Sequence, residues 1–81
     1  MRLPRDLGGE ELAVMLSRYG YEVTRQTGSH MRVTTMREGE HHVTIPRHAS
    51  LRVGTLSGIL SDVCEHLGIP KPELVETLFG K

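Results

Sequence analysis

Several features that mark particular protein classes are missing from this sequence. Cys64 is the single cysteine among 81 residues, so no internal disulfide can form and a reducing compartment is expected. No apolar run approaches the ~18 residues needed to span a bilayer, and charged side chains interrupt residues 1–20, where a signal peptide would have its apolar core. We therefore expect a cytoplasmic protein with no membrane role.

The chain also has no net charge, because ten basic side chains balance ten acidic ones. Taken alone, this balance argues against a strongly electrostatic nucleic-acid binder. The distribution is uneven, however. Residues 23–53 contain five arginines and two glutamates, which gives this segment a charge of +3, while the rest of the chain carries −3. A polyanion would find one favourable region there, with an affinity that falls as salt rises.

Five histidines invite a metal-binding interpretation, but the pattern around them is weak. His41 and His42 are adjacent in a predicted strand, so their side chains point to opposite faces and cannot chelate one ion together. The sequence has no cysteine pair and no His-x-x-x-His on a helix. We therefore expect no metal and no other cofactor, and we interpret Cys64 as a packing residue.

Two stretches place apolar residues at the 3.6-residue spacing of an amphipathic helix. The first covers residues 9–19 and is ended by Gly20, with the apolar positions Leu12, Met15, Leu16 and Tyr19. The second is closed by Gly68, with the apolar positions Leu56, Ile59, Leu60, Val63 and Leu67. Residues 73–79 can form a short third helix that packs on this core, or a tail that contacts a partner or a second copy; packing is favoured because small cores gain from a cap.

Between these helices, apolar and polar residues alternate as in half-buried strands. Residues 21–27 place Tyr21 and Val23 on one face, with the polar face formed by Glu22, Thr24 and Gln26. Gly28 marks a turn, and the strand from His30 points Met31 and Val33 inward, which leaves His30 and Arg32 facing solvent together. After a polar connection at residues 36–40, a third strand ends at Pro46, with Val43 and Ile45 inward and His42 and Thr44 outward.

This order of elements predicts an α+β fold, in which a three-stranded antiparallel sheet has its helices packed on one face. We expect a single domain over residues 1–81, with a core of about residues 9–68 and a C-terminal extension at residues 69–81. The opposite face of the sheet is bare and carries His30, Arg32, His42 and Thr44. Polar residues are ordinary on the solvent side of a sheet, so this pattern alone leaves a plain solvated surface as an alternative to a binding site.

His30 is the most informative of these residues, because it follows a glycine turn at the head of a strand with apolar neighbours. A histidine can give or take a proton near neutral pH, and a rigid support makes that proton useful in chemistry. An ordinary exposed strand residue is the competing interpretation.

Four segments of the chain resemble, in the correct order, the HicA toxins of bacterial and archaeal toxin–antitoxin pairs. Glu11-Leu12 through Tyr19-Gly20-Tyr21 resembles the family's first helix and the entry to its first strand. Arg25-Gln26-Thr27-Gly28-Ser29-His30 is similar to its R-Q-x-G-S-H signature. The last two anchors are Val43-Thr44-Ile45-Pro46-Arg47-His48, similar to its V-T-V/I-P-x-H segment, and Gly54-Thr55-Leu56, similar to the G-T-L that opens its second helix. Together they cover about residues 9–68.

The resemblance implies a fold like that of double-stranded RNA-binding domains and an activity as a metal-independent ribonuclease that cleaves mRNA. The family's catalytic histidine corresponds to His30. Around it, the candidate RNA-binding residues are Ser29, Arg32, Arg25, Arg47 and His48, with Gly28 as the structural turn.

Family membership would also imply a HicB-type antitoxin that covers the RNA-binding face, and a second copy of the chain is a further candidate partner. Two other classes of function remain open at this point. One is a non-catalytic module that keeps the fold and binds RNA or antitoxin, and the other is a structural adaptor without RNA affinity.

Overall fold

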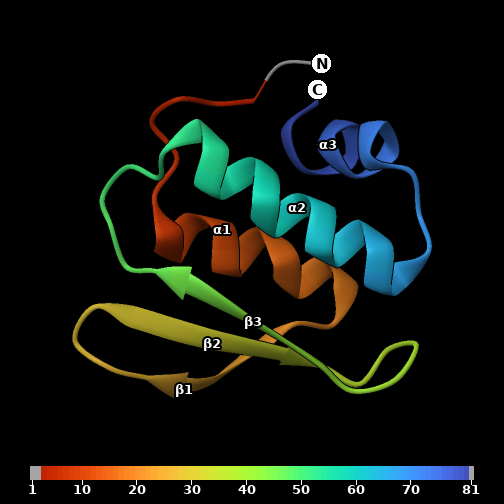
Figure 1. The fold of residues 1–81 in the computed structure, drawn as a ribbon, viewed down its shortest axis with the longest axis horizontal. Coiled ribbons are helices and arrows are strands. Elements are labelled where there is room, and N and C mark those ends of the chain that lie inside the picture. The colour runs from red at the N-terminus through yellow and green to blue at the C-terminus, as the bar shows by residue number, and fades with distance from the viewer. Residues whose placement is uncertain (1–2, 81) are drawn as a thin grey trace.

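A computed structural model describes residues 3–80 of the chain and contains the predicted helix, three strands and helix, followed by a short C-terminal helix (Figure 1). The elements are α1 (Gly9–Leu16), the 3-10 turn η1 (Ser17–Tyr19), β1 (Glu22–Gln26), β2 (His30–Thr35), β3 (His41–Pro46), α2 (Val53–Leu67) and α3 (Lys71–Phe79). Among these helices, none has the length and apolar character that crossing a membrane requires. The order of helices and strands confirms the predicted α+β fold.

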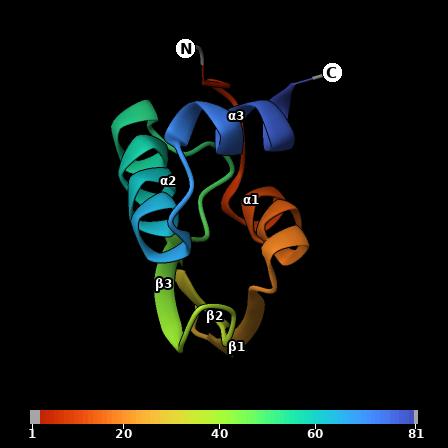
Figure 2. The same ribbon diagram turned by 90° about the vertical axis from the view of Figure 1, so that its right-hand side faces the viewer.

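The strands form one antiparallel sheet in the order β1-β2-β3, and α1 and α2 cover one of its faces (Figure 2). Apolar residues of β2 and β3 point into the space between the layers, where Met31, Val33, Val43 and Ile45 are all buried. The helices meet them with the buried side chains Leu12, Leu16, Leu56, Ile59, Leu60 and Val63. The predicted inward faces of both helices and of these two strands are therefore correct.

The C-terminal helix α3 lies on the side of α1 and α2 that faces away from the sheet (Figure 2). Its Leu74, Val75 and Leu78 are buried, and Arg18 of η1 donates a hydrogen bond to the carbonyl oxygen of Thr77 at 3.0 Å. The prediction that this segment packs on the core of its own chain is thereby confirmed. Cys64 is buried in α2 as expected, and its burial raises the pKa of its thiol.

Strand β1 differs from its prediction. Every one of its residues is exposed, and the buried Tyr21 lies just before it. A β-bulge also interrupts its pairing with β2: Val23 lies opposite Val33, but Arg25, not Thr24, lies opposite Arg32. The extra residue shifts the alternation by one, so the placement of Gln26 on the face of Glu22 was wrong, and Gln26 instead lies opposite Met31 on the helix side.

The start of α1 is held against the segment that follows β3. Gly9 donates a backbone hydrogen bond to His48 at 3.0 Å, and Leu51 donates one to Leu7 at 2.7 Å. A Cβ atom on Gly9 would overlap the carbonyl oxygen of Pro46, so only glycine allows this approach. The first helix also ends earlier than predicted, since residues 17–19 tighten into η1 before Gly20, whose φ is +84°.

Replacing Gly9 with alanine should therefore destabilise the protein by about 1–3 kcal/mol, because the methyl group forces α1 away from β3. Gly58 provides a matched control, since it lies in α2 and a Cβ there meets nothing within 4 Å. Gly58→Ala should stabilise by about 0.5–1 kcal/mol through helix propensity. Urea unfolding measures both free energies, and equal effects of the two substitutions would contradict the close approach.

Candidate functional site

The face of the sheet opposite the helices, called the outer face below, carries a concentration of polar side chains. Residues at every second position of β2 point there, and the pairing with β3 brings His30 beside Pro46, Arg32 beside Thr44, and Thr34 beside His42. The bulge in β1 adds Arg25 opposite Arg32. The predicted outward set, His30, Arg32, His42 and Thr44, is thus gathered on one exposed surface.

His30 is held at the head of β2 by a tight hydrogen-bonded turn. The amide of Thr27 donates to the carbonyl of His30 at 2.9 Å, and the amide of His30 donates to Thr27 Oγ1 at 3.2 Å. Ser29 Oγ lies 3.0 Å from His30 Nδ1. A serine hydroxyl can donate or accept, so it supports either tautomer of the imidazole, and among residues 3–80 Nε2 has no hydrogen-bond partner and can transfer a proton.

Gly28 lies in this turn as predicted, but the fold does not require a glycine there. Its φ is outside the left-handed region that Gly20, Gly39 and Gly68 occupy, and a Cβ on it would meet no atom within 4 Å. The glycine therefore leaves open space next to His30, where a side chain would otherwise project.

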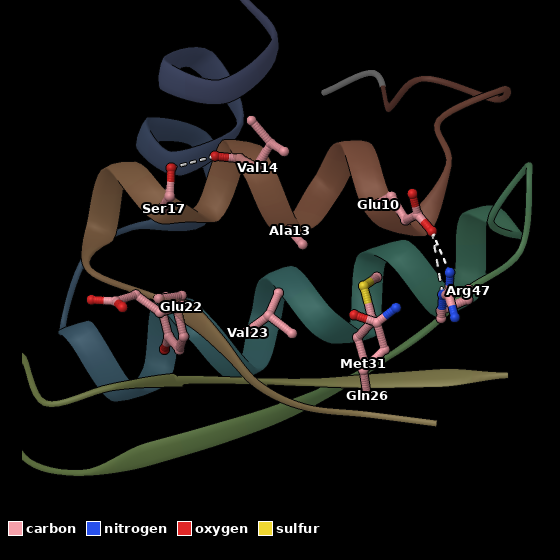
Figure 3. A pocket seen from close by; sticks show the side chains of 10 residues that line it. Glu10, Ala13, Val14, Ser17, Glu22, Val23, Gln26, Met31 and Arg47 are labelled. Carbon is pink, nitrogen blue, oxygen red and sulfur yellow. Dashed lines mark hydrogen bonds and ion pairs between the residues drawn. The ribbon is translucent and has the colours of Figure 1, made fainter. Parts of the chain in front are cut away.

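Arg47 is committed to intramolecular contacts. Its guanidinium donates to Glu10 Oε2 at 2.8 and 3.3 Å (Figure 3). It also donates to the carbonyl oxygen of Thr27 at 3.2 Å. The side chain is only 28% exposed. It connects the start of α1 to the turn that carries His30, which suits it to positioning that turn.

Arg25 and Arg32 stand in contrast to Arg47. They lie directly opposite each other on neighbouring strands, both are exposed, and within residues 3–80 neither forms an ion pair. Two like charges in this position destabilise a sheet, and a bound anion removes that cost. The pair is therefore suited to holding a phosphate on the outer face.

His48 is not gathered with these residues. It is exposed and lines a hollow of about 310 Å³ beside the start of α1, together with Gly8, Glu10, Glu11, Arg47 and Ala49. A groove of about 480 Å³ between α1 and β1 is likewise separate from the outer face, since its wall includes the inward-facing Val23, Gln26 and Met31 (Figure 3).

A chain of hydrogen bonds across the outer face was not anticipated from the sequence. Glu40 Oε2 lies 2.7 Å from His42 Nε2, His42 Nδ1 lies 2.7 Å from Thr34 Oγ1, and Thr34 Oγ1 lies 2.7 Å from Thr24 Oγ1. The alternation of residues predicted that Thr34 and His42 share a face, but only the strand register places them side by side.

His41 points to the other side of β3, as the strand parity predicted. Its Nδ1 lies 2.7 Å from the hydroxyl of Tyr21, its Nε2 lies 3.2 Å from Asp62 Oδ1, and its ring stacks on that of His66 at 4.2 Å. Burial, with a smaller contribution from the charge of Asp62, raises the pKa of Tyr21 to about 12. Within the described residues, no three His, Cys, Asp or Glu side chains are grouped so as to hold a metal ion.

Comparison with known protein families matched most of the chain. A family model described as the HicA toxin of bacterial toxin–antitoxin matches residues 9–69 of the chain. This range runs from the start of α1 past the end of α2 and includes the turn that carries His30. Neither the curated proteins nor the solved structures contain a match.

The raised pKa of Tyr21 gives a prediction for alkaline pH. The folded protein keeps this phenol protonated up to about 12, whereas the unfolded chain releases the proton near 10, so the contribution to stability is complete below 10 and is lost as the pH rises from 10 to 12. The urea midpoint of the wild type should therefore fall more steeply between pH ~10 and ~12 than that of Tyr21→Phe. If the urea midpoints of the two proteins fell in parallel as the pH rises, the Tyr21 hydroxyl would not be shielded from solvent.

Proposed function

The chain belongs to the HicA toxin family of bacterial toxin–antitoxin systems, and from this membership we propose that it is an endoribonuclease that cleaves mRNA with His30 as general acid and base. One observation carries the proposal. His30 is exposed on the outer face and its Nδ1 is engaged by Ser29. Arg32, two positions farther along β2, lies opposite Arg25, and neither arginine has an ion-pair partner among residues 3–80.

The proposed reaction needs no metal, because RNA contains its own nucleophile. His30 Nε2 accepts the proton of a 2′-hydroxyl while that oxygen attacks the adjacent phosphorus. The bond from phosphorus to the 5′ oxygen then breaks, and the leaving oxygen takes a proton, either back from His30 or from water. The products are a 2′,3′-cyclic phosphate on one fragment and a 5′-hydroxyl on the other.

Neighbouring residues support this step in two different ways. Arg32 and Arg25 are proposed to bind the phosphate and stabilise the charge that grows on it in the transition state. Ser29 orients the imidazole from 3.0 Å. Arg47, through Glu10 and the carbonyl of Thr27, keeps the turn in place, and its contacts favour this positioning role over direct binding of RNA. His48 is proposed only as an outlying RNA contact, because it lies in a separate hollow.

As a toxin of such a system, the protein has an antitoxin as its partner. We propose that this antitoxin is of the HicB type and inhibits by covering the outer face. The exposure of that face supports the proposal, since any protein seated on the paired arginines and His30 excludes RNA by volume and by charge.

His30→Ala should lower RNA cleavage in excess EDTA by about 100-fold or more, the lower end of what one general acid–base residue contributes. His30→Gln, which keeps size and polarity but cannot transfer a proton near neutral pH, should be equally inactive. The free energy of unfolding of both variants should lie within about 0.5 kcal/mol of the wild-type value, because the position is exposed. Gel analysis should find a 2′,3′-cyclic phosphate or its 3′-phosphate hydrolysis product.

Retained cleavage in both variants would remove His30 from the chemistry. If folded, antitoxin-free wild type binds RNA and cuts none of it, the non-catalytic binding module becomes the better description.

Arg32→Ala should weaken binding of a non-cleavable RNA strand and lower the slope of log affinity against log salt by about 0.7, the value for one lost phosphate contact on a single strand. Arg18→Ala is the matched control, because Arg18 lies in η1 and contacts α3. Fluorescence anisotropy at several salt concentrations measures both slopes. An unchanged slope in Arg32→Ala would place the phosphate elsewhere.

A further inference from the structure

A hollow of about 460 Å³ lies where β1 begins and β2 ends, at the opposite end of β2 from His30. Its lining residues are Gly20, Glu22, Thr24, Thr34, Thr35, Met36 and Arg37. We propose that this hollow, called the β1–β2 hollow below, binds a nucleobase of the RNA strand and prefers bases that carry an exocyclic amine. The inference rests on the proposed function and assigns it a second, base-reading subsite.

The two ends of the outer face carry different charged side chains. Near His30 lie Arg25 and Arg32, which form no ion pair with the residues that the structure describes and which suit a phosphate. At the far end, Glu22 lines the β1–β2 hollow and Glu40 accepts from His42 next to it. Arg37 also lines the hollow, so its guanidinium balances the Glu22 carboxylate there, and with Glu40 beside it the local charge does not favour an anion. A ligand that fits here is therefore neutral and has a polar edge, as a nucleobase has.

The chain of hydrogen bonds described above fixes what this surface offers. With its proton on Nε2, the ring of His42 donates to the carboxylate of Glu40 and accepts the hydroxyl of Thr34 at Nδ1. The hydroxyl of Thr24 lies 2.7 Å from Thr34 Oγ1 and 3.3 Å from the carbonyl oxygen of Arg32, so its proton also has an acceptor within the protein. Both threonine protons are used within the protein, so the oxygens present only lone pairs to a ligand.

The β1–β2 hollow also has groups that can contact the flat face of a base. Met36 lines the hollow and is 69% exposed, so its side chain is available to contact a flat ring. The guanidinium of Arg37 lies over the ring of Tyr19, 5.6 Å from its centroid, which holds its plane in place. Unstacked RNA bases are commonly bound on arginine planes in this way, and their edges are then hydrogen-bonded.

These features predict which bases are preferred. Glu22, Thr24 and Thr34 are all acceptors, and the amino groups of adenine, cytosine and guanine are donors that match them. Uracil has no amino group, and its single edge donor, N3–H, is flanked by two carbonyl oxygens that meet like partners. Uracil should therefore bind worst.

The subsite reads a nucleotide other than the one that is cut. Thr34 follows His30 by four residues on β2, which places it about 13 Å farther along the strand. A single RNA strand that lies along the outer face can therefore hold its scissile phosphate at His30 and a more distant base in the β1–β2 hollow. Binding there would favour cleavage at certain positions of an mRNA.

The experiment compares fully 2′-O-methylated oligonucleotides of adenosine, cytidine and uridine, which cannot be cleaved because the attacking hydroxyl is blocked. Fluorescence anisotropy with the wild type should show about 3- to 10-fold weaker binding of the uridine strand, the loss expected for one unmade hydrogen bond. Thr34→Val and Glu22→Gln should each reduce this ratio towards one. Glu22→Gln should at the same time bind every strand more tightly, because a negative charge is removed.

The matched controls are Thr77→Val and Glu76→Gln on the exposed surface of α3, which should keep the wild-type ratio. A ratio of one in the wild type, or a ratio that neither site variant changes, would overturn the subsite and leave the catalytic proposal to its own test. A wild type that binds none of the strands would overturn both. Glu22 is fully on the surface of an edge strand, so its variant tests the subsite even if Thr34→Val folds poorly.

Discussion

The contact between the start of α1 and the end of β3 is the constraint on which the candidate site depends. Gly9 has no side chain, so the helix approaches the carbonyl of Pro46 closely enough to donate a backbone hydrogen bond to His48. That approach brings Glu10 within 2.8 Å of Arg47, whose guanidinium then reaches the turn before His30. The orientation of an exposed histidine is thus controlled from the helix layer, on the other side of the sheet.

The zero net charge of the chain is compatible with an RNA ligand because charge is sorted over the outer face. Arg25 and Arg32 face each other without a carboxylate between them, while Glu22 and Glu40 lie at the opposite end. Attraction of a polyanion depends on this local field over distances of about 8–10 Å, the range that salt leaves unscreened, and not on the sum over all residues.

Histidines have different roles according to the face of the sheet on which they lie. His41 is bonded to Tyr21 and Asp62 and stacked on His66, so it connects β3 to α2 and belongs to the structure. His42, the next residue, is bonded to Thr34 and through it to Thr24 on the outer face, where His30 is also exposed. One step along a strand changes the environment of the ring, because successive side chains point to opposite faces.

Patterns within short stretches of sequence determined the helices, the strands, the bare outer face and the exposure of His30, since helical and strand periodicity are local properties of the backbone. The family motif around His30 was equally readable, because it is a continuous run of residues. Tertiary structure alone decided that a bulge in the edge strand turns Arg25 towards Arg32, that Arg47 pairs with Glu10 across 37 positions, and that four side chains from the strands and the connection before β3 form one hydrogen-bonded chain. These features depend on the register between strands and on contacts distant in sequence, which the order of residues in any single element does not specify.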